Sequence, residues 1–221
     1  MKNNFVAIFD LDYTLWNHVP IEEQSMRITE YLQIPFSKEF VKQISDFWEG
    51  HCLEGKKISR ELVASMIEKH IPYLRLYGRN GEDLLDSMRV TGKISLNEGA
   101  LSLLNFLKNN GITIIACTDW FLEEQYELMD RFGIRAFFDE VFSWEGTYQK
   151  PSKVRMEEIV SKFPGKRFIY IGDSLSRDML SASYIKGCVP IWYRKEAKEN
   201  SLPIHYDTDD LNTIIPVLEE L

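Results

Sequence analysis

The sequence contains no long hydrophobic run. None of its segments reaches the ~18 consecutive apolar residues of a membrane-spanning helix, and Asp10 interrupts the one apolar run near the N-terminus. We therefore expect neither a transmembrane segment nor a secretory signal peptide. Lysine and arginine are outnumbered by aspartate and glutamate, 26 against 34, which gives a formal net charge of −8. This charge argues against non-specific binding to nucleic acid and against adhesion to an anionic membrane.

Cysteine and histidine are scarce. Cys52, Cys117 and Cys188 are odd in number and far apart, and none belongs to a Cys-x-x-Cys pair. This pattern favours buried thiols in a reducing compartment, so we expect a cytoplasmic protein; a catalytic thiol is the alternative. The four histidines and three cysteines form no cluster with the ligand spacing of a zinc site.

The chain is long enough for one large domain or for a domain that carries an insertion. Its 221 residues are 44% apolar and 27% charged, which is ordinary for a globular protein. From Val19 to about Lys93 the apolar residues recur at helical spacing, and no strand pattern interrupts them. In this block Ser37 is placed to cap a helix with an apolar stripe of Phe40, Ile44, Phe47 and Trp48.

Short apolar runs elsewhere predict five buried strands, at residues 5–9, 112–117, 140–143, 168–171 and 189–193. Helical patterns separate the last four; Leu101, Leu104 and Leu107 mark the helix before them, and Asp178 to Lys186 form a later one. Continuous apolar strands that alternate with helices indicate a parallel sheet with helices on both faces.

We therefore predict an α/β fold in three layers. Residues 1–16 and 94–221 would form a Rossmann-like parallel-sheet core, and residues 17–93 a helical cap domain inserted after the first strand. In such open sheets, ligands bind beyond the carboxyl ends of the strands. The residues that follow each strand are therefore the candidates for a functional site.

Four predicted strands are followed by polar or charged residues. Asp10-Leu-Asp12-Tyr-Thr14 follows the first strand, and Thr118-Asp119 follows the second. Lys150-Pro151 comes after the third strand, across a loop, and Gly172-Asp173-Ser174 after the fourth, with Asp178 in the next helix. Taken alone, the two acids of the first motif are equally consistent with a polar turn. The later motifs favour a site.

The charges of these residues predict a bound cation. Four carboxylates would face one positive charge, that of Lys150, and they belong to Asp10, Asp12, Asp173 and Asp178. An all-oxygen ligand set without histidine or cysteine suits Mg²⁺. Thr118, Lys150 and the N–H groups of the helix after Thr118 would bind a phosphoryl group. Mg²⁺ and phosphate beside a strand-end carboxylate predict phosphoryl transfer, with that carboxylate as nucleophile.

The four motifs, in this order, resemble those of the haloacid dehalogenase (HAD) superfamily, specifically its phosphatase branch with an inserted helical (C1-type) cap. The resemblance implies that Asp10 attacks phosphorus, forms an aspartyl-phosphate and binds Mg²⁺. Asp12 would bind the metal through its backbone carbonyl, and its side chain would act as general acid and then as general base. Thr118, Asp119 and Lys150 would form the phosphate-binding group, and Lys150 would also neutralise Asp10.

The resemblance also implies that Asp173 completes the metal site, with Ser174 and Asp178 behind it. Family members that cleave carbon–halogen bonds lack the second acid of the first motif, so Asp12 argues against dehalogenation. The sequence departs from the commonest family pattern at Tyr13, where many members have glycine, and at Asn97-Glu98-Gly99, in place of a frequent Pro-Gly. These departures weaken the assignment to a particular subfamily but not the assignment to the phosphatase branch.

In this family the cap selects the leaving group, and a helical cap suits a small-molecule phosphate ester, of the nucleotide or sugar phosphate class. The candidate selecting residues are Trp16, His18, Trp48, His51 and Trp120. The alternative for Trp48 is that it packs with Phe47 inside the cap. For the whole chain the alternatives are a phosphomutase like the β-phosphoglucomutases and a non-catalytic binding protein on the same fold.

Overall fold

The structure is a computed structural model that describes residues 4–50, 53–91, 94–193 and 201–221. The chain divides into two compact units, which we call the core unit (residues 1–17, 95–144 and 150–221) and the helical unit (18–94 and 145–149). The predicted domain boundaries, after residues 16 and 93, lie one residue before those of the structure. The prediction also placed residues 145–149 in the core, whereas they belong to the helical unit.

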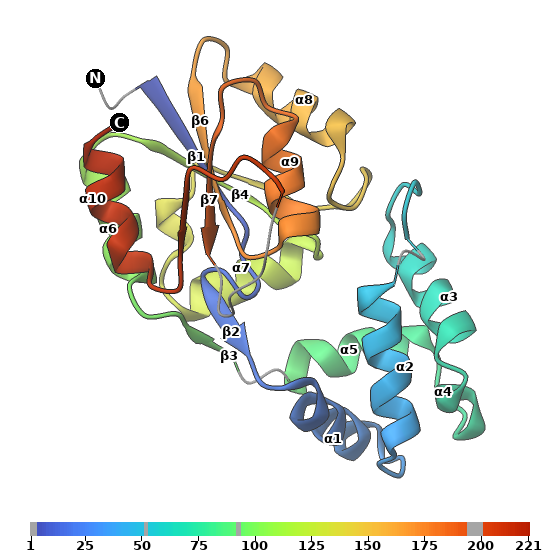
Figure 1. Ribbon diagram of the computed structural model, residues 1–221. Coiled ribbons are helices and arrows are strands. Elements are labelled where there is room, and N and C mark those ends of the chain that lie inside the picture. Colours follow the sequence, from blue (N-terminus) through green and yellow to red (C-terminus); the bar gives the residue numbers. More distant parts are fainter. Residues whose placement is uncertain (1–3, 51–52, 92–93, 194–200) are drawn as a thin grey trace. The chain divides into compact units, whose positions relative to one another are not determined.

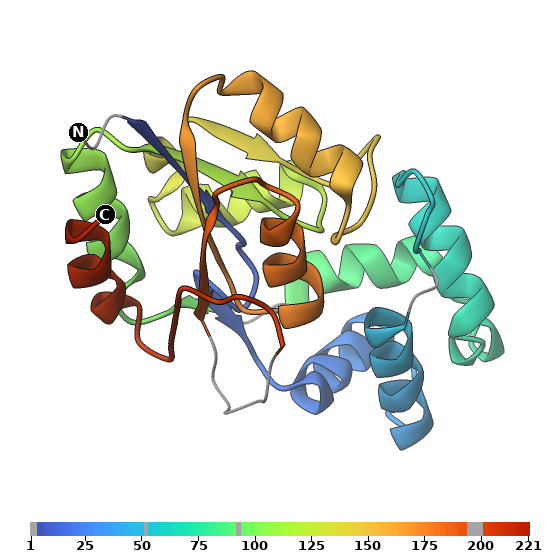
Figure 2. The ribbon, with the colours of Figure 1, turned by 45° about the horizontal axis from the view of Figure 1, so that its top comes forward.

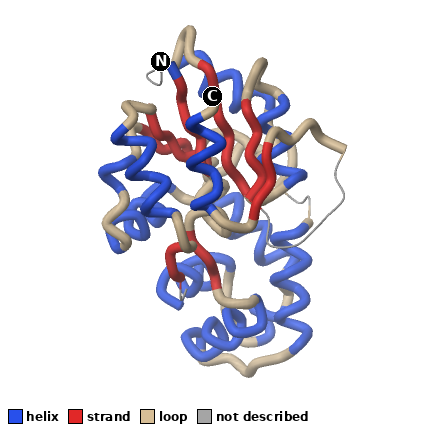
Figure 3. Tube along the Cα trace, turned by 60° about the vertical axis from the view of Figure 1, so that its left-hand side comes forward, coloured by secondary structure: helices blue, strands red, loops and turns tan. Residues whose placement is uncertain are grey.

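A parallel sheet of six strands forms the centre of the core unit (Figures 1 and 3). The strand order is β5-β4-β1-β6-β7-β8, and every neighbouring pair is parallel. The strands are β1 (Phe5–Phe9), β4 (Thr113–Cys117), β5 (Glu140–Phe142), β6 (Arg167–Gly172), β7 (Val189–Tyr193) and β8 (Tyr206–Thr208). The five predicted strands are confirmed. The sequence did not predict β8, because its three residues carry no apolar run.

Helices cover both faces of this sheet (Figure 2). The helices of the core unit are α6 (Ala100–Asn109), α7 (Leu122–Arg131), α8 (Lys153–Lys162), α9 (Leu180–Ser183) and α10 (Ile214–Glu219). α6 and α10 lie on one face, and α8 and α9 on the other. Val6 and Ile8 of β1, whose side chains point the same way, belong to one buried cluster with Met156 of α8 and Ala182 of α9. The predicted three-layer α/β fold is confirmed.

Two predicted helices of the core unit differ in detail. In α6, Leu101 is 48% exposed, because the buried stripe passes instead through Ala100, Leu103, Leu104 and Leu107. The single helix predicted from Asp178 to Lys186 is a π-helical turn (η3, Leu175–Met179) followed by α9. The N–H groups of Asp178 and Met179 both donate to the carbonyl of Ser174, which widens this turn.

The first two of the four crossings between the units run through a separate pair of short strands, β2 (Trp16–His18) and β3 (Ile94–Leu96) (Figure 3). The sequence did not predict them, because three residues are too few for a periodic pattern. The unit boundary falls within each strand.

The helical unit contains α1 (Ile21–Leu32), α2 (Lys38–Glu49), α3 (Arg60–His70), α4 (Tyr73–Leu76) and α5 (Gly81–Thr91). Ser37 caps α2 as predicted, since its side chain accepts from the N–H of Phe40 at 3.1 Å. Residues 145–149 join this unit through Ile58, which exchanges two backbone hydrogen bonds of 2.8 Å with Gly146 and Thr147. None of the helices in the described residues combines the length and apolar character needed to span a membrane.

Candidate active site

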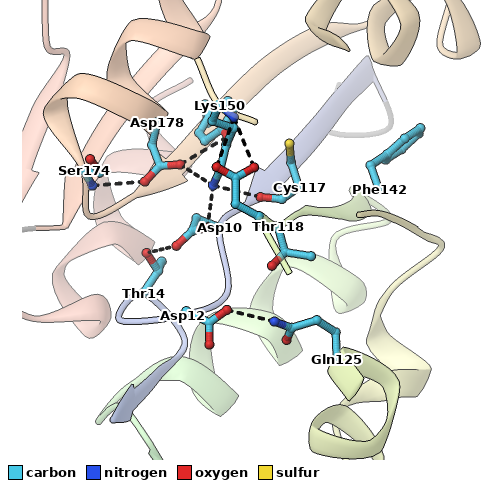
Figure 4. Close-up of polar contacts among 12 residues, drawn as sticks. Asp10, Asp12, Thr14, Cys117, Thr118, Gln125, Phe142, Lys150, Ser174 and Asp178 are labelled. Atoms are coloured by element: carbon cyan, nitrogen blue, oxygen red, sulfur yellow. Dashed lines mark hydrogen bonds and ion pairs between the residues drawn. The ribbon is translucent and has the colours of Figure 1, made fainter. Parts of the chain in front are cut away.

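The predicted site residues of the core unit meet at the carboxyl ends of its strands (Figure 4). Phe9, the last residue of β1, pairs with Ala116 of β4 and Ile171 of β6. The next residues continue this register: the N–H of Asp10 donates to the carbonyl of Ile171, and the N–H of Thr118 donates to that of Phe142, both at 2.9 Å. The continuous apolar strands thus place the polar residue after each strand at one edge of the sheet.

Lys150 lies at the centre of the cluster. Its Nζ donates to Asp10 Oδ1 at 2.6 Å, to Asp178 Oδ1 at 2.6 Å and to the carbonyl of Cys117 at 3.1 Å. The side chains of these three charged residues are at most 9% exposed. Thr14 donates to the second oxygen of Asp10 at 3.1 Å. Because an ammonium has three hydrogens, these contacts use all of them and hold the Asp10 carboxylate in place.

The site carries more negative charge than one lysine balances. Burial and the charge of Asp178 raise the pKa of Asp10 well above its usual value, although Lys150 opposes the shift. Burial, followed by the charge of Asp178, raises the pKa of Asp173 to about 7. Burial alone would lower the pKa of Lys150, but Asp10 and Asp178 raise it well above its usual value. Lys150 therefore stays protonated, while the carboxylates compete for further positive charge.

Three of these carboxylates fit a hard divalent cation. Asp10, Asp173 and Asp178 each offer an oxygen, and the three atoms lie within 4.8 Å of one another. Oxygen donors at this density suit Mg²⁺. Trp192 of β7 donates its indole N–H to the carbonyl of Asp173 at 2.8 Å, and the N–H of Ser174 donates to Asp178 at 3.0 Å. Asp178, expected behind the metal site, thus contacts Lys150 directly and is one of the three candidate ligands.

Asp12 is held apart from these carboxylates. Trp16 donates its indole N–H to Asp12 Oδ1 at 2.9 Å, and Gln125 of α7 donates to Oδ2 at 2.8 Å (Figure 4). Trp16 is fully buried and packs on Phe132, with ring centroids 5.9 Å apart. The contacts of Trp16 therefore support the acid, and its predicted role in substrate selection stays a prediction. No sequence pattern predicted the contact of Gln125.

The second motif separates into a hydroxyl and a structural carboxylate. Thr118 Oγ1 is buried and has no hydrogen-bond partner among the described residues, which fits its predicted contact with a phosphoryl group. Asp119, predicted in the phosphate-binding group, instead accepts from the N–H of Lys150 at 3.0 and 3.1 Å and from Arg155 at 2.6 Å. These donors occupy both oxygens of its carboxylate, and the predicted contact of Asp119 with a phosphoryl group stays a prediction. Arg155, which the sequence analysis missed, interrupts the apolar stripe of α8.

Asn97 ties the loop of the first motif to β3. Its side-chain N–H₂ donates to the carbonyls of Thr14 at 2.8 Å and Tyr13 at 3.2 Å, and its backbone N–H donates to the carbonyl of Leu15 at 2.9 Å. Asn17 donates to the side-chain oxygen of Asn97. The departure from Pro-Gly at this position thus supplies donors that hold the loop between Asp12 and β2.

The other candidate selecting residues lie in both units. His18 is half-buried at the end of β2. Trp120 donates to Glu124 and stacks on Trp144, with ring centroids 6.0 Å apart. In the helical unit, Trp48 packs edge-on against Phe47, with ring centroids 4.7 Å apart. This contact agrees with the alternative that Trp48 packs with Phe47 inside the cap. His51 lies outside the described residues.

The described cysteines do not support a catalytic thiol. Cys117 and Cys188 form no disulfide. Burial raises the pKa of Cys188 to about 12 and raises that of Cys117 above its usual value. Since the thiolate is the nucleophile, neither thiol is activated. Cys52 lies outside the described residues.

A parallel α/β core with a buried carboxylate–lysine cluster at its strand ends defines an enzyme fold of the HAD type. The family model for haloacid dehalogenase-like hydrolases matches residues 6–185. The chain therefore belongs to the haloacid dehalogenase-like hydrolases.

Solved structures with different activities share this fold. YfnB from Bacillus subtilis, a candidate HAD hydrolase bound to magnesium, is 22% identical, with coverage of 98% of this chain and 99% of that chain and a TM-score of 0.76. A 2-haloacid dehalogenase from Pseudomonas syringae is 18% identical (97% and 98%, TM-score 0.66). A candidate β-phosphoglucomutase from Thermotoga maritima is 18% identical (98% and 99%, TM-score 0.62). A search of the curated proteins found no match.

Proposed function

We propose that this hydrolase is a Mg²⁺-dependent phosphatase of small phosphomonoesters, of the nucleotide or sugar phosphate class. The observation that carries the proposal is Asp12, whose two carboxylate oxygens are held by Trp16 and Gln125. An oxygen leaving group needs a proton as its bond to phosphorus breaks, whereas a halide does not. A carboxyl group oriented two residues beyond Asp10 supports phosphate ester hydrolysis over dehalogenation.

In the first step, an oxygen of Asp10 attacks phosphorus and the bond from phosphorus to the leaving oxygen breaks. Asp12, in its protonated form, gives its proton to that oxygen, so the alcohol departs neutral. Lys150 orients Asp10 at 2.6 Å, and the Thr118 hydroxyl donates to a phosphoryl oxygen. The product of this step is an aspartyl-phosphate on Asp10.

In the second step, water attacks the phosphorus of the aspartyl-phosphate. Asp12 is now ionised and takes a proton from that water, which restores its acid form. The bond between phosphorus and the Asp10 oxygen breaks, and inorganic phosphate leaves. One carboxyl group thus acts first as acid and then as base.

Asp10, Asp173 and Asp178 would hold the Mg²⁺ ion, with the backbone carbonyl of Asp12 as the further ligand that the family resemblance implies. Bound Mg²⁺ supplies positive charge that offsets the phosphoryl oxygens and the carboxylates. The grouping of three carboxylate oxygens within 4.8 Å supports this assignment, as does the magnesium bound to YfnB. The cytoplasmic location expected from the cysteines stays a prediction.

Phosphate release from a panel of phosphomonoesters tests the proposal, with Mg²⁺ and with a chelator. We expect Mg²⁺-dependent release that Asp10→Asn abolishes and that Asp130→Asn, on the surface of the same unit, leaves unchanged. Equal release by wild type and Asp10→Asn would refute an enzymatic role for this site. Isomerisation of a sugar phosphate without net release would instead indicate a phosphomutase, and halide release from a 2-haloacid a dehalogenase.

A further inference from the structure

We propose that the buried ion pair of Asp119 and Arg155 positions Thr118 for phosphoryl binding and Lys150 beside Asp10, and that it cancels a negative charge beside the phosphate. The inference rests on the proposed phosphatase function. It assigns a positioning role to two residues that do not themselves touch the reacting atoms.

Arg155 connects the ends of two strands. Its side chain is 2% exposed. Its Nη1 donates to Asp119 Oδ1 at 2.6 Å, and its Nη2 donates to the carbonyls of Thr118 at 2.6 Å and Phe142 at 2.9 Å. The planar guanidinium offers these donors in a rigid fork. Arg155 therefore holds the residue after β4 against the last residue of β5.

Asp119 connects the same fork to Lys150. Both of its carboxylate oxygens accept from the backbone N–H of Lys150, at 3.0 and 3.1 Å. The ion pair thus contacts the backbones of both residues expected to hold the phosphoryl group. Since these contacts are to backbone atoms, the Thr118 hydroxyl remains for the phosphoryl group, and the Lys150 ammonium remains for Asp10 and Asp178.

The charge of the pair matters as well as its geometry. The carboxylate of Asp119, next to Thr118 in the chain, would repel a phosphate dianion if it were unpaired. Arg155 cancels that charge from within the buried stripe of α8, where it lies beside Met156. A buried guanidinium is costly unless it is paired and hydrogen-bonded, and this one has an anion and two carbonyls. The two residues therefore act as a unit.

Three variants separate charge from position. Asp119→Asn keeps an oxygen for the Lys150 N–H but leaves the Arg155 charge unbalanced, so inorganic phosphate should bind about tenfold more tightly. Arg155→Met leaves the Asp119 carboxylate unbalanced, so phosphate should bind about tenfold more weakly. In the double variant the charges balance again and phosphate affinity should return toward the wild-type value. Arg155→Met and the double variant should also lower kcat at least tenfold, because the fork between Thr118 and Phe142 is lost. Asp119→Asn keeps the fork and should lower kcat less.

The measurements are the kcat for p-nitrophenyl phosphate and the dissociation constant of inorganic phosphate from calorimetry, both with saturating Mg²⁺. Thermal unfolding shows which variants are folded at the assay temperature. Arg155→Lys, which keeps the charge without the fork, replaces Arg155→Met if that variant does not fold; it should lose kcat with little change in phosphate affinity. The matched controls are Asp130→Asn and Arg135→Met, which break an exposed 2.8 Å ion pair of the same unit.

A purely structural role would lower the melting temperature and leave kcat and phosphate affinity of the folded variants within twofold of wild type. That result, with an active wild type, overturns the inference alone. An inactive wild type that still binds phosphate, with opposite shifts in Asp119→Asn and Arg155→Met, overturns the phosphatase proposal and retains the charge role of the pair. A wild type that neither binds phosphate nor hydrolyses the ester overturns both.

Discussion

Asp10 and Asp12 are the same residue type two positions apart, and their surroundings separate them. Asp10 is buried against the Lys150 ammonium at 2.6 Å. Asp12 is half-buried and accepts from two neutral donors, the indole of Trp16 and the amide of Gln125. Lys150 favours the ionised form of Asp10 against burial and the charge of Asp178, whereas no cation lies among the two donors that hold Asp12. These contacts suit a nucleophile in the first case and a proton carrier in the second.

At this scale we predict that Asp12→Asn lowers kcat by about 10²–10⁴-fold for an alkyl phosphate. In the first step the loss for p-nitrophenyl phosphate should be much smaller, because its leaving group departs without a proton, whereas the loss of the base in the second step is the same for both substrates. The pre-steady-state rate of leaving-group release with both substrates measures the ratio for the first step. Trp16→Phe keeps the buried ring and removes one donor to Asp12, so its effect should have the same pattern and a smaller size. Equal losses in the rate of leaving-group release with both substrates would show that Asp12 is not the acid.

At the scale of elements, the end of β6 brings Asp178 into the site. Gly172 is the last residue of β6, and a methyl group at its Cβ position would lie 2.5 Å from the side-chain carbons of Asp178. The π-helical turn that follows directs the Asp178 carboxylate to Lys150 at 2.6 Å. The absence of a side chain at Gly172 is therefore a requirement of the site.

Gly172→Ala should displace Asp178 from Lys150 and lower both kcat and Mg²⁺ affinity, each by about tenfold or more. Mg²⁺ titration of the activity measures both quantities. The control is Gly187→Ala in the same unit, where no atom lies within 4 Å of the added methyl group. Its positive φ of 72° should cost about 1 kcal/mol of stability without changing the titration. Full activity in Gly172→Ala would contradict the packing argument.

In the helical unit, the end of α1 offers a stability test. Gln33 follows α1 in the left-handed conformation, with φ 55° and ψ 44°, and its side chain is exposed. A residue with a Cβ atom pays roughly 1–2 kcal/mol there, and glycine is the usual choice. Gln33→Gly should therefore raise the free energy of unfolding by about 0.5–1 kcal/mol, allowing for the greater entropy of unfolded glycine.

Urea unfolding followed by circular dichroism checks this value. Gln33→Ala is the matched control, because alanine keeps the Cβ atom and should give no such gain. If both variants changed the free energy of unfolding equally, strain at Gln33 would not be the cause.

At the scale of the whole molecule, the balance of charge links the site to pH. The pKa of Asp173 is raised to about 7 and that of Asp10 is also raised, first by burial and then by Asp178. A raised carboxyl pKa favours the protonated form in the folded state. The metal-free fold therefore loses stability as the pH rises from the usual carboxyl pKa through about 7, and Mg²⁺ should stabilise it most above pH 7.

It follows that Mg²⁺ must displace a proton below pH 7. We predict that Mg²⁺ affinity falls by about tenfold for each pH unit below 7 for one displaced proton. Calorimetry at pH 6 and pH 8, in buffers with different heats of ionisation, measures the affinity and the protons released. Asp173→Asn should bind Mg²⁺ more weakly and with less dependence on pH. An affinity that is the same at both pH values, with no proton release, would contradict this account.

Local sequence patterns predict five of the six strands of the sheet and the main outline of the site. Its apolar runs are long enough to predict strands β1, β4, β5, β6 and β7, and parallel strands must end at a common edge. Asp10, Thr118, Lys150 and Asp173 could therefore be predicted together, because each follows a strand directly or after one loop. The oxygen-only chemistry of these residues also predicted the type of metal ion.

The residues that support that site are identified by contacts between segments far apart in the sequence. Gln125 reaches Asp12 from 113 positions away, and Arg155 reaches Asp119 from 36 positions away. Arg155 holds the Asp119 carboxylate, and the indole of Trp16 donates to Asp12 beside Gln125. No periodic pattern encodes such pairs, because a polar residue on a buried face looks the same whether or not a partner meets it. The strands follow from local apolar patterns, whereas the support of the site follows from packing between distant segments.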